Sequence, residues 1–273
     1  MKKTFLHLSD IHFRREYPNI QEGYDSIFHK MSSPLVRLDE CFRLVPVESL
    51  DFVLISGDLT ENGNAGDYEI LRDFFDHKLN GTPLCVTLGN HDNKPEFYRG
   101  WLNALESKAP FNQIINIGRF HVISFDNSSP PEYPNGTVSE SQTVWLRDAL
   151  KKVEGSPCIL ITHHHLRSDQ SDIPPAVFEE SFVELVRQSV LQAIFCGHTH
   201  HSYCGRFAGK PYFTAGGISF AAETIGDCVV FYESSSVHLC QWSEEGISVQ
   251  NIPILQKGRE LCTLFPQAIR QNG

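Results

Sequence analysis

The chain has 273 residues, of which 41% are hydrophobic, and this is enough to bury the core of one full domain. Acidic residues outnumber basic residues by 33 to 23, and the formal net charge of −10 disfavours a protein that grips duplex nucleic acid through its phosphates. No apolar stretch approaches the ~18 residues of a membrane span, and polar residues interrupt the N-terminal apolar run too early for a signal peptide.

Strand-like and helix-like segments alternate over the first part of the chain. Apolar runs predict β-strands at residues 4–9, 51–56, 83–88, 119–125, 157–162 and 192–196. Helical periodicity predicts helices at residues 35–44, 68–79, 144–153 and 178–191. This alternation is typical of a layered α/β core.

The C-terminal third has a different pattern. Short apolar pieces between Gly and Ser turns predict strands at residues 212–214, 228–232, 237–242 and 246–252. We expect them to form an antiparallel sheet that completes a sandwich with the first sheet. The whole chain, residues 1–273, is then one domain with a core at 4–201, a β-rich part at 202–255 and a tail at 256–273. Residues 14–31 have no steady period and predict a loop over the mouth of the site.

Five short motifs with metal-ligand side chains follow directly on predicted strands. They contain Asp10 and His12, Asp58, Asn90 with His91 and Asp92, His163 to His165, and His198 with His200. Because successive parallel strands present their carboxyl ends at one edge of a sheet, we expect these side chains to converge there.

Each motif alone has an ordinary structural explanation. Asp58 could cap a helix, Asn90 and His91 could form a turn, and His198 and His200 could share one face of a strand. The presence of all five in this order favours a metal site instead.

The ordered set D-x-H, G-D, G-N-H-D, a histidine motif and G-H-x-H resembles the calcineurin-like metallophosphoesterases over residues 4–201. Residues 7–12, 57–63 and 196–200 are most similar to bacterial class III cyclic-nucleotide phosphodiesterases and glycerophosphodiesterases. The resemblance implies a four-layer αββα sandwich, in which helices flank two mixed β-sheets.

The resemblance also implies two divalent ions and their ligands. The first ion would be held by Asp10, His12, Asp58 and His200. The second would be held by Asp58, Asn90, His163 and His198, so that Asp58 bridges the pair. Two ions ~3.5–4 Å apart can clamp an in-line displacement at phosphorus, with a hydroxide between them as nucleophile. Imidazole, carboxylate and amide ligands suit Mn, Fe or Zn without selecting sharply among them.

The remaining histidines need separate interpretation. In the family pattern His91 contacts the phosphate and protonates the leaving group, and Asp92 could orient its ring or cap the helix near Pro95. We favour His163 over His164 as a ligand because it directly ends the apolar run. The roles of His164 and His165 stay open, and we expect His201 at the rim. The other histidines are predicted to be structural or exposed: His7, His29, His77, His121 and His238.

The sequence therefore predicts an enzyme that hydrolyses a phosphodiester or a small phosphomonoester. A non-catalytic scaffold of the same fold would be expected to lack some ligands, and no position of the implied set is substituted. A DNA exonuclease would be expected to carry a basic stripe, which the sequence lacks. The eight cysteines lack a CxxC pair and favour free thiols in a cytoplasmic protein. We expect a small phosphate ester as partner, no stable binding to nucleic acid or membrane, and leave a homo-oligomer open.

Overall fold

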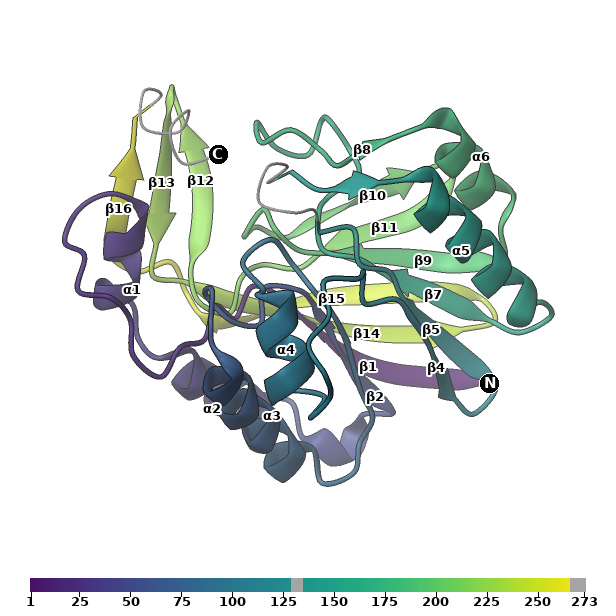
Figure 1. Ribbon diagram of the computed structural model, residues 1–273, viewed down its shortest axis with the longest axis horizontal. Helices are drawn as coiled ribbons and strands as arrows, with labels where there is room; N and C mark the ends of the chain where they lie inside the picture. The colour runs from purple at the N-terminus through teal and green to yellow at the C-terminus, as the bar shows by residue number, and fades with distance from the viewer. Residues whose placement is uncertain (129–134, 266–273) are drawn as a thin grey trace.

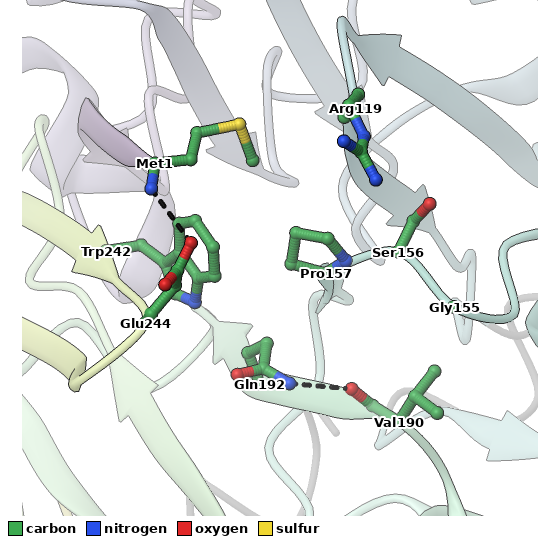
Figure 2. Close-up of a pocket in the computed structure, with 9 residues that line it drawn as sticks. All are labelled: Met1, Arg119, Gly155, Ser156, Pro157, Val190, Gln192, Trp242 and Glu244. Atoms are coloured by element: carbon green, nitrogen blue, oxygen red, sulfur yellow. Dashed lines mark hydrogen bonds and ion pairs between the residues drawn. The ribbon is translucent and has the colours of Figure 1, made fainter.

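The computed structural model describes residues 1–128 and 135–265. Two mixed β-sheets stack face to face, with strand orders β15-β14-β1-β2-β3 and β10-β11-β9-β7-β5-β4 (Figure 1). The first sheet contains β1 (Lys2–Leu8), β2 (Phe52–Ser56), β3 (Leu84–Thr87), β14 (Ser235–Ser243) and β15 (Gly246–Leu255). The second contains β4 (Gln113–Ile117), β5 (Phe120–Ser124), β7 (Cys158–Ile161), β9 (Leu191–Cys196), β10 (Tyr203–Phe207) and β11 (Lys210–Thr214).

Helices cover the outer faces of both sheets. The helices are α2 (Pro34–Leu44), α3 (Ala65–Leu79) and α4 (Lys94–Gly100) on the first sheet, and α5 (Glu140–Lys152) and α6 (Glu180–Gln188) on the second. Strands buried on both faces read as continuous apolar runs, because one face meets the helices and the other meets the facing sheet. In β1, Leu6 packs in the helix-facing core and Phe5 in the core between the sheets. The predicted four-layer αββα sandwich is confirmed.

Strand direction brings the motifs to one edge. β1, β2 and β3 run parallel, and so do β5, β7, β9 and β11. The carboxyl ends of β1, β2, β3, β7 and β9 precede the five motifs. The capping boxes of Asn64 with Asp67 and of Ser139 with Gln142 fix where α3 and α5 begin.

The C-terminal strands do not form one sheet of their own, contrary to the expectation from the sequence. β14 and β15 extend the first sheet, because β14 pairs antiparallel with β1 over Lys2 to His7. β11 joins the second sheet beside β9. The sequence pattern also missed β4, β10, α4 and the short parallel pair β6 (Thr137–Val138) and β8 (Val177–Phe178).

A small third sheet projects from the sandwich, at the end away from the N-terminus (Figure 1). It contains β12 (Ala221–Ile225), β13 (Cys228–Tyr232) and β16 (Glu260–Leu264), so the predicted tail supplies one of its strands. The predicted loop 14–31 contains a 3-10 helix, η1 (Tyr24–Ser26), and a short helix, α1 (Ile27–Lys30). Ile27 and Phe28 pack with Phe231 and Leu261 of this sheet. Within the described residues, no helix combines the length and the apolar character needed to cross a membrane.

Candidate metal centre

The backbone at the strand ends is left-handed at five of the predicted ligands. The φ values are 54° at Asp10, 49° at His12, 51° at Asp58, 74° at His198 and 55° at His200. Such residues are uncommon outside glycine, and each costs about 1–3 kcal/mol, so they persist mainly where function requires them. His198 and His200 lie in the turn that follows β9 and not on a strand, so the alternative in which they share one face of a strand is wrong.

The first donor group comes from the ends of β1 and β9. Nε2 of His12 lies 3.2 Å from Nε2 of His200, which in turn lies 3.3 Å from Oδ1 of Asp10. Nε2 of His12 is 3.5 Å from Oδ2 of Asp58. All four side chains are buried or nearly so. Two nitrogens and two carboxylates therefore face one small volume.

The second donor group shares the carboxylate of Asp58. Nε2 of His163 lies 3.2 Å from Oδ2 of Asp58 and 3.2 Å from Oδ1 of Asn90. Nδ1 of His198 lies 3.1 Å from the same oxygen of Asn90. The structure thus brings together all seven predicted ligands, with Oδ2 of Asp58 between Nε2 of His12 and Nε2 of His163.

The outer nitrogens of the histidines show that these residues fit cations. Nδ1 of His163 donates to the carbonyl of Ser56 at 2.7 Å, and Nδ1 of His200 donates to the carbonyl of Phe220 at 3.0 Å. A carbonyl only accepts, so a neutral ring presents the lone pair of Nε2 to the oxygens and nitrogens inside the centre. Converging lone pairs repel unless a proton or a cation lies among them.

At His163 a proton takes this place in the metal-free protein. Burial acts against a charged ring at His163, but the carboxylate of Asp58 outweighs it and raises the pKa of His163 to about 9. Burial also opposes the charge of Asp58, and the imidazoles of His163 and His91 outweigh it, which holds the pKa of Asp58 well below its usual value. A bound cation would displace the proton of His163.

The motif glycines leave room for the ligands. A Cβ on Gly89 would lie 2.1 Å from Oδ1 of Asp58, and a Cβ on Gly57 would lie 2.5 Å from Nδ1 of His163. Gly57 also has a φ of 95°, which L-residues with side chains rarely adopt. Glycine is therefore the residue that lets the strand ends approach the centre.

The three consecutive histidines point in different directions. Only His163 approaches the shared carboxylate in the contacts described above, while Nδ1 of His164 lies 3.3 Å from Oδ1 of Asn127. The donor atoms of His164, His163 and His198 nevertheless lie within 4.8 Å of one another. Nε2 of His165 donates to the carbonyl of Ile173 at 3.0 Å. These distances favour His163 as the ligand and leave His164 beside it.

Glu61 is a residue that sequence reasoning missed. Its Oε2 lies 2.7 Å from Nδ1 of His12, and its Oε1 lies 2.9 Å from Nδ1 of His91. It stands three residues after Asp58 on the same loop, and this spacing was the available signal. Burial opposes its charge, but His91 and His12 outweigh it and lower the pKa of Glu61 to about 2.

Asp92 does not orient the ring of His91, contrary to the prediction. Its carboxylate accepts hydrogen bonds from the amides of Leu59, Thr60 and Gly89 and from the hydroxyl of Tyr68. The alternative of a helix cap is wrong too, because Asn93 caps α4.

These bonds give Asp92 a different place in the site. They connect the loop that follows β2 to the loop that follows β3, and so fix the position of Asp58 relative to Asn90. Burial, followed by the charge of Asp58, raises the pKa of Asp92 to about 6.

Residues 3–202 match the calcineurin-like phosphoesterase family, and the chain belongs to that family. Among its relatives is a cAMP/cGMP dual specificity phosphodiesterase of Mycobacterium tuberculosis, 27% identical over 216 residues. That match covers 76% of this chain and 65% of the relative, slightly less than two thirds of its length. A glycerophosphodiester phosphodiesterase of Enterobacter lignolyticus is 27% identical over 209 residues, which cover 71% of this chain and 70% of the relative.

A solved structure with the same fold is GAP50, the anchor in the inner membrane complex of Plasmodium. Its TM-score is 0.57 at 12% identity, with 97% of this chain and 88% of that chain covered. Similarity at this level concerns the fold alone, because unrelated functions share folds. The function must therefore be argued from the site.

Proposed function

We propose that this protein hydrolyses a phosphodiester, either a cyclic nucleotide or a glycerophosphodiester, with two divalent ions bound at the centre. The observation that carries the proposal is the shared oxygen Oδ2 of Asp58, which lies 3.5 Å from Nε2 of His12 and 3.2 Å from Nε2 of His163. A carboxylate in this position can bridge two ions at the spacing of two-metal hydrolases. One relative is named a cAMP/cGMP phosphodiesterase and another a glycerophosphodiester phosphodiesterase, and these two names support the substrate class.

The assignment of ligands follows the two donor groups. Asp10, His12 and His200 would hold the first ion, and Asn90, His163 and His198 the second, with Asp58 between them. When bound, such ions lower the pKa of water and neutralise the charge that develops on the phosphoryl oxygens. The donors suit Mn, Fe or Zn. Three outer hydrogen bonds would hold the imidazole rings in the orientation that metal binding needs. The partners are the carbonyl of Ser56 for His163, the carbonyl of Phe220 for His200 and the carboxylate of Glu61 for His12.

His91 would supply the proton for the leaving group. Its Nδ1 is held by Glu61, so Nε2 is the nitrogen that remains to meet a substrate, and the side chain is 23% exposed. Its backbone amide donates to Oδ1 of Asp58 at 2.9 Å, which fixes its place next to the carboxylate that would hold both ions. The departing oxygen of an alkyl ester is a poor leaving group, and a proton from Nε2 would stabilise it.

An activity screen tests the proposal. The metal-free protein is reconstituted separately with Mn²⁺, Fe²⁺ and Zn²⁺ and assayed on a 3′,5′-cyclic nucleotide, a glycerophosphodiester and a small phosphomonoester. We expect metal-dependent hydrolysis that favours one of the diesters. Preference for the monoester would contradict the substrate class. Binding of two ions without any hydrolysis would favour the non-catalytic scaffold.

We also propose a cytoplasmic location for the enzyme and a small phosphate ester as its partner. All eight cysteines are free thiols, which supports a cytoplasmic location because disulfides form mainly in oxidising compartments. The formal charge of −10 favours a small phosphate ester over nucleic acid as the partner and counts against a DNA exonuclease.

A further inference from the structure

The core between the two sheets changes from apolar to polar close to the strand ends that carry the candidate metal centre. Further from these ends it contains Phe5, Phe52 and Phe195, stacked or edge to face. Two residues further along β1 the same inward face carries His7, which is fully buried. Buried polar groups in native proteins nearly always have hydrogen-bond partners, so the partners of His7 indicate its role.

His7 begins a chain of buried hydrogen bonds. Its Nε2 lies 2.8 Å from Oγ of Ser56, and that oxygen lies 2.9 Å from Oγ of Ser9. Oγ of Ser9 donates in turn to the carbonyl of Ser56 at 3.4 Å. If each hydroxyl donates onward, the N–H at Nε2 of His7 is the donor that starts the series. All three side chains are fully buried, so water does not compete for these bonds.

The series ends on the carbonyl that orients a predicted metal ligand. The same carbonyl of Ser56 accepts the 2.7 Å hydrogen bond from Nδ1 of His163. Ser56 and Ser9 are also the residues just before Gly57 and Asp10, where the chain turns into the left-handed conformation. His7 is thus linked to the ring of His163 although it belongs to neither donor group.

We infer that His7 is a positioning residue for the second ion: through the hydroxyls of Ser56 and Ser9 it fixes the carbonyl that sets the orientation of His163. The inference rests on the proposed function, because it assumes that His163 is a metal ligand. Outer hydrogen-bond partners of ligating histidines typically change metal affinity or activity 10–100-fold when removed. His7 lies three hydrogen bonds away from that carbonyl, so its effect depends on how rigidly Ser56 and Ser9 are held.

The environment of His7 keeps the ring neutral, so the ring carries no second N–H that would be buried without a partner. Burial, followed by the nearby His238, lowers the pKa of His7 well below its ordinary value. A neutral imidazole carries one N–H, and the contact with Ser56 is the one described for Nε2. Nδ1 of His7 has no hydrogen-bond partner within the described residues.

His238 provides a matched control. It lies directly opposite His7 on β14, is 2% exposed, and its ring is 5.6 Å from that of His7. Its Nε2 bonds to Oγ of Ser202 at 2.7 Å and not to Ser56. The same substitution therefore removes a similarly buried imidazole at either position. Only the imidazole of His7 starts the hydrogen-bond series toward His163.

The experiment compares His7→Asn, His7→Gln and His238→Asn with the wild type. A glutamine amide reaches the position of Nε2, whereas an asparagine amide reaches only that of Nδ1. Each metal-free protein is titrated with Mn²⁺ by calorimetry. We expect His7→Asn to weaken the second binding event about 10-fold or more and to spare the first. His7→Gln and His238→Asn should stay within a few-fold of the wild type. Equal losses in both Asn variants, or no recovery with Gln, would overturn the inference.

A second readout needs no metal. NMR of the metal-free protein measures the solvent exchange of the N–H at Nδ1 of His163, assigned with a His163→Ala variant. We expect faster exchange in His7→Asn than in His238→Asn, and unchanged exchange would overturn the inference. If the wild type binds fewer than two ions, the proposed function fails, and the exchange rates still decide whether His7 positions His163.

Discussion

The carboxylate of Glu61 lies 2.9 Å from Nδ1 of His91, and this contact orients the ring and stabilises its protonated form. Burial alone would lower the pKa of His91, but the charges of Glu61 and Asp58 outweigh it and raise that pKa to about 10 in the metal-free protein. A raised pKa keeps the ring protonated, as a general acid requires.

Glu61→Gln should therefore move the pH dependence of hydrolysis. A general acid works only while protonated, so activity is lost as the pH rises through its pKa. Removing the charge of Glu61 lowers the pKa of His91, and the alkaline limb of kcat/KM should shift to lower pH. The measurement is a pH–rate profile of the metal-saturated variant and wild type. An alkaline limb that stays in place would show that Glu61 does not tune His91.

Asp58→Ala should remove metal as well as activity. Oδ2 of Asp58 faces both donor groups, so both ions lose a ligand at once. Elemental analysis after reconstitution and desalting should find fewer than two ions per chain. Two ions still bound to the folded variant would refute the bridging role.

The histidine run offers a test of register. His163→Ala should lose mainly the second ion, because Nε2 of His163 approaches Asp58 and Asn90. His165→Ala is the control and should keep both ions, because its ring bonds to the carbonyl of Ile173. Metal content and calorimetric titration separate the two. If His164→Ala loses the ion and His163→Ala keeps it, the ligand is the next residue along.

His91→Ala should keep both ions and lose activity unevenly. A general acid contributes ~10²–10⁴-fold, and chiefly when the leaving group is a poor one. A cyclic nucleotide or glycerophosphodiester, which releases an alkoxide, should therefore slow far more than a nitrophenyl diester. Steady-state kinetics on both substrates provide the comparison. Equal slowing would mean that His91 binds the phosphate in both cases without acting as the acid.

Much of the fold and of the site could be predicted from local pattern. Apolar runs bounded by polar motifs predicted β1, β2, β3, β5, β7 and β9, because strands buried on both faces need continuous apolar sequence. The motifs converge because parallel strands present their carboxyl ends at one edge. The ligand set from Asp10 to His200 was implied by the resemblance of these motifs to a known family, and the structure brings the donor atoms into two adjoining groups.

The tertiary structure alone decided which partners these residues have. Glu61 lies three residues after Asp58, and Asp92 belongs to the third motif. The left-handed backbone at Asp58 and the loop after β3 nevertheless turn Glu61 toward His91 and Asp92 toward backbone amides. The pairing of β14 with β1 joins segments more than 200 residues apart and sets His238 beside His7. Such contacts depend on long-range register and loop geometry, which a local sequence pattern does not carry, whereas strand position and ligand type depend on neighbouring residues and can be read directly.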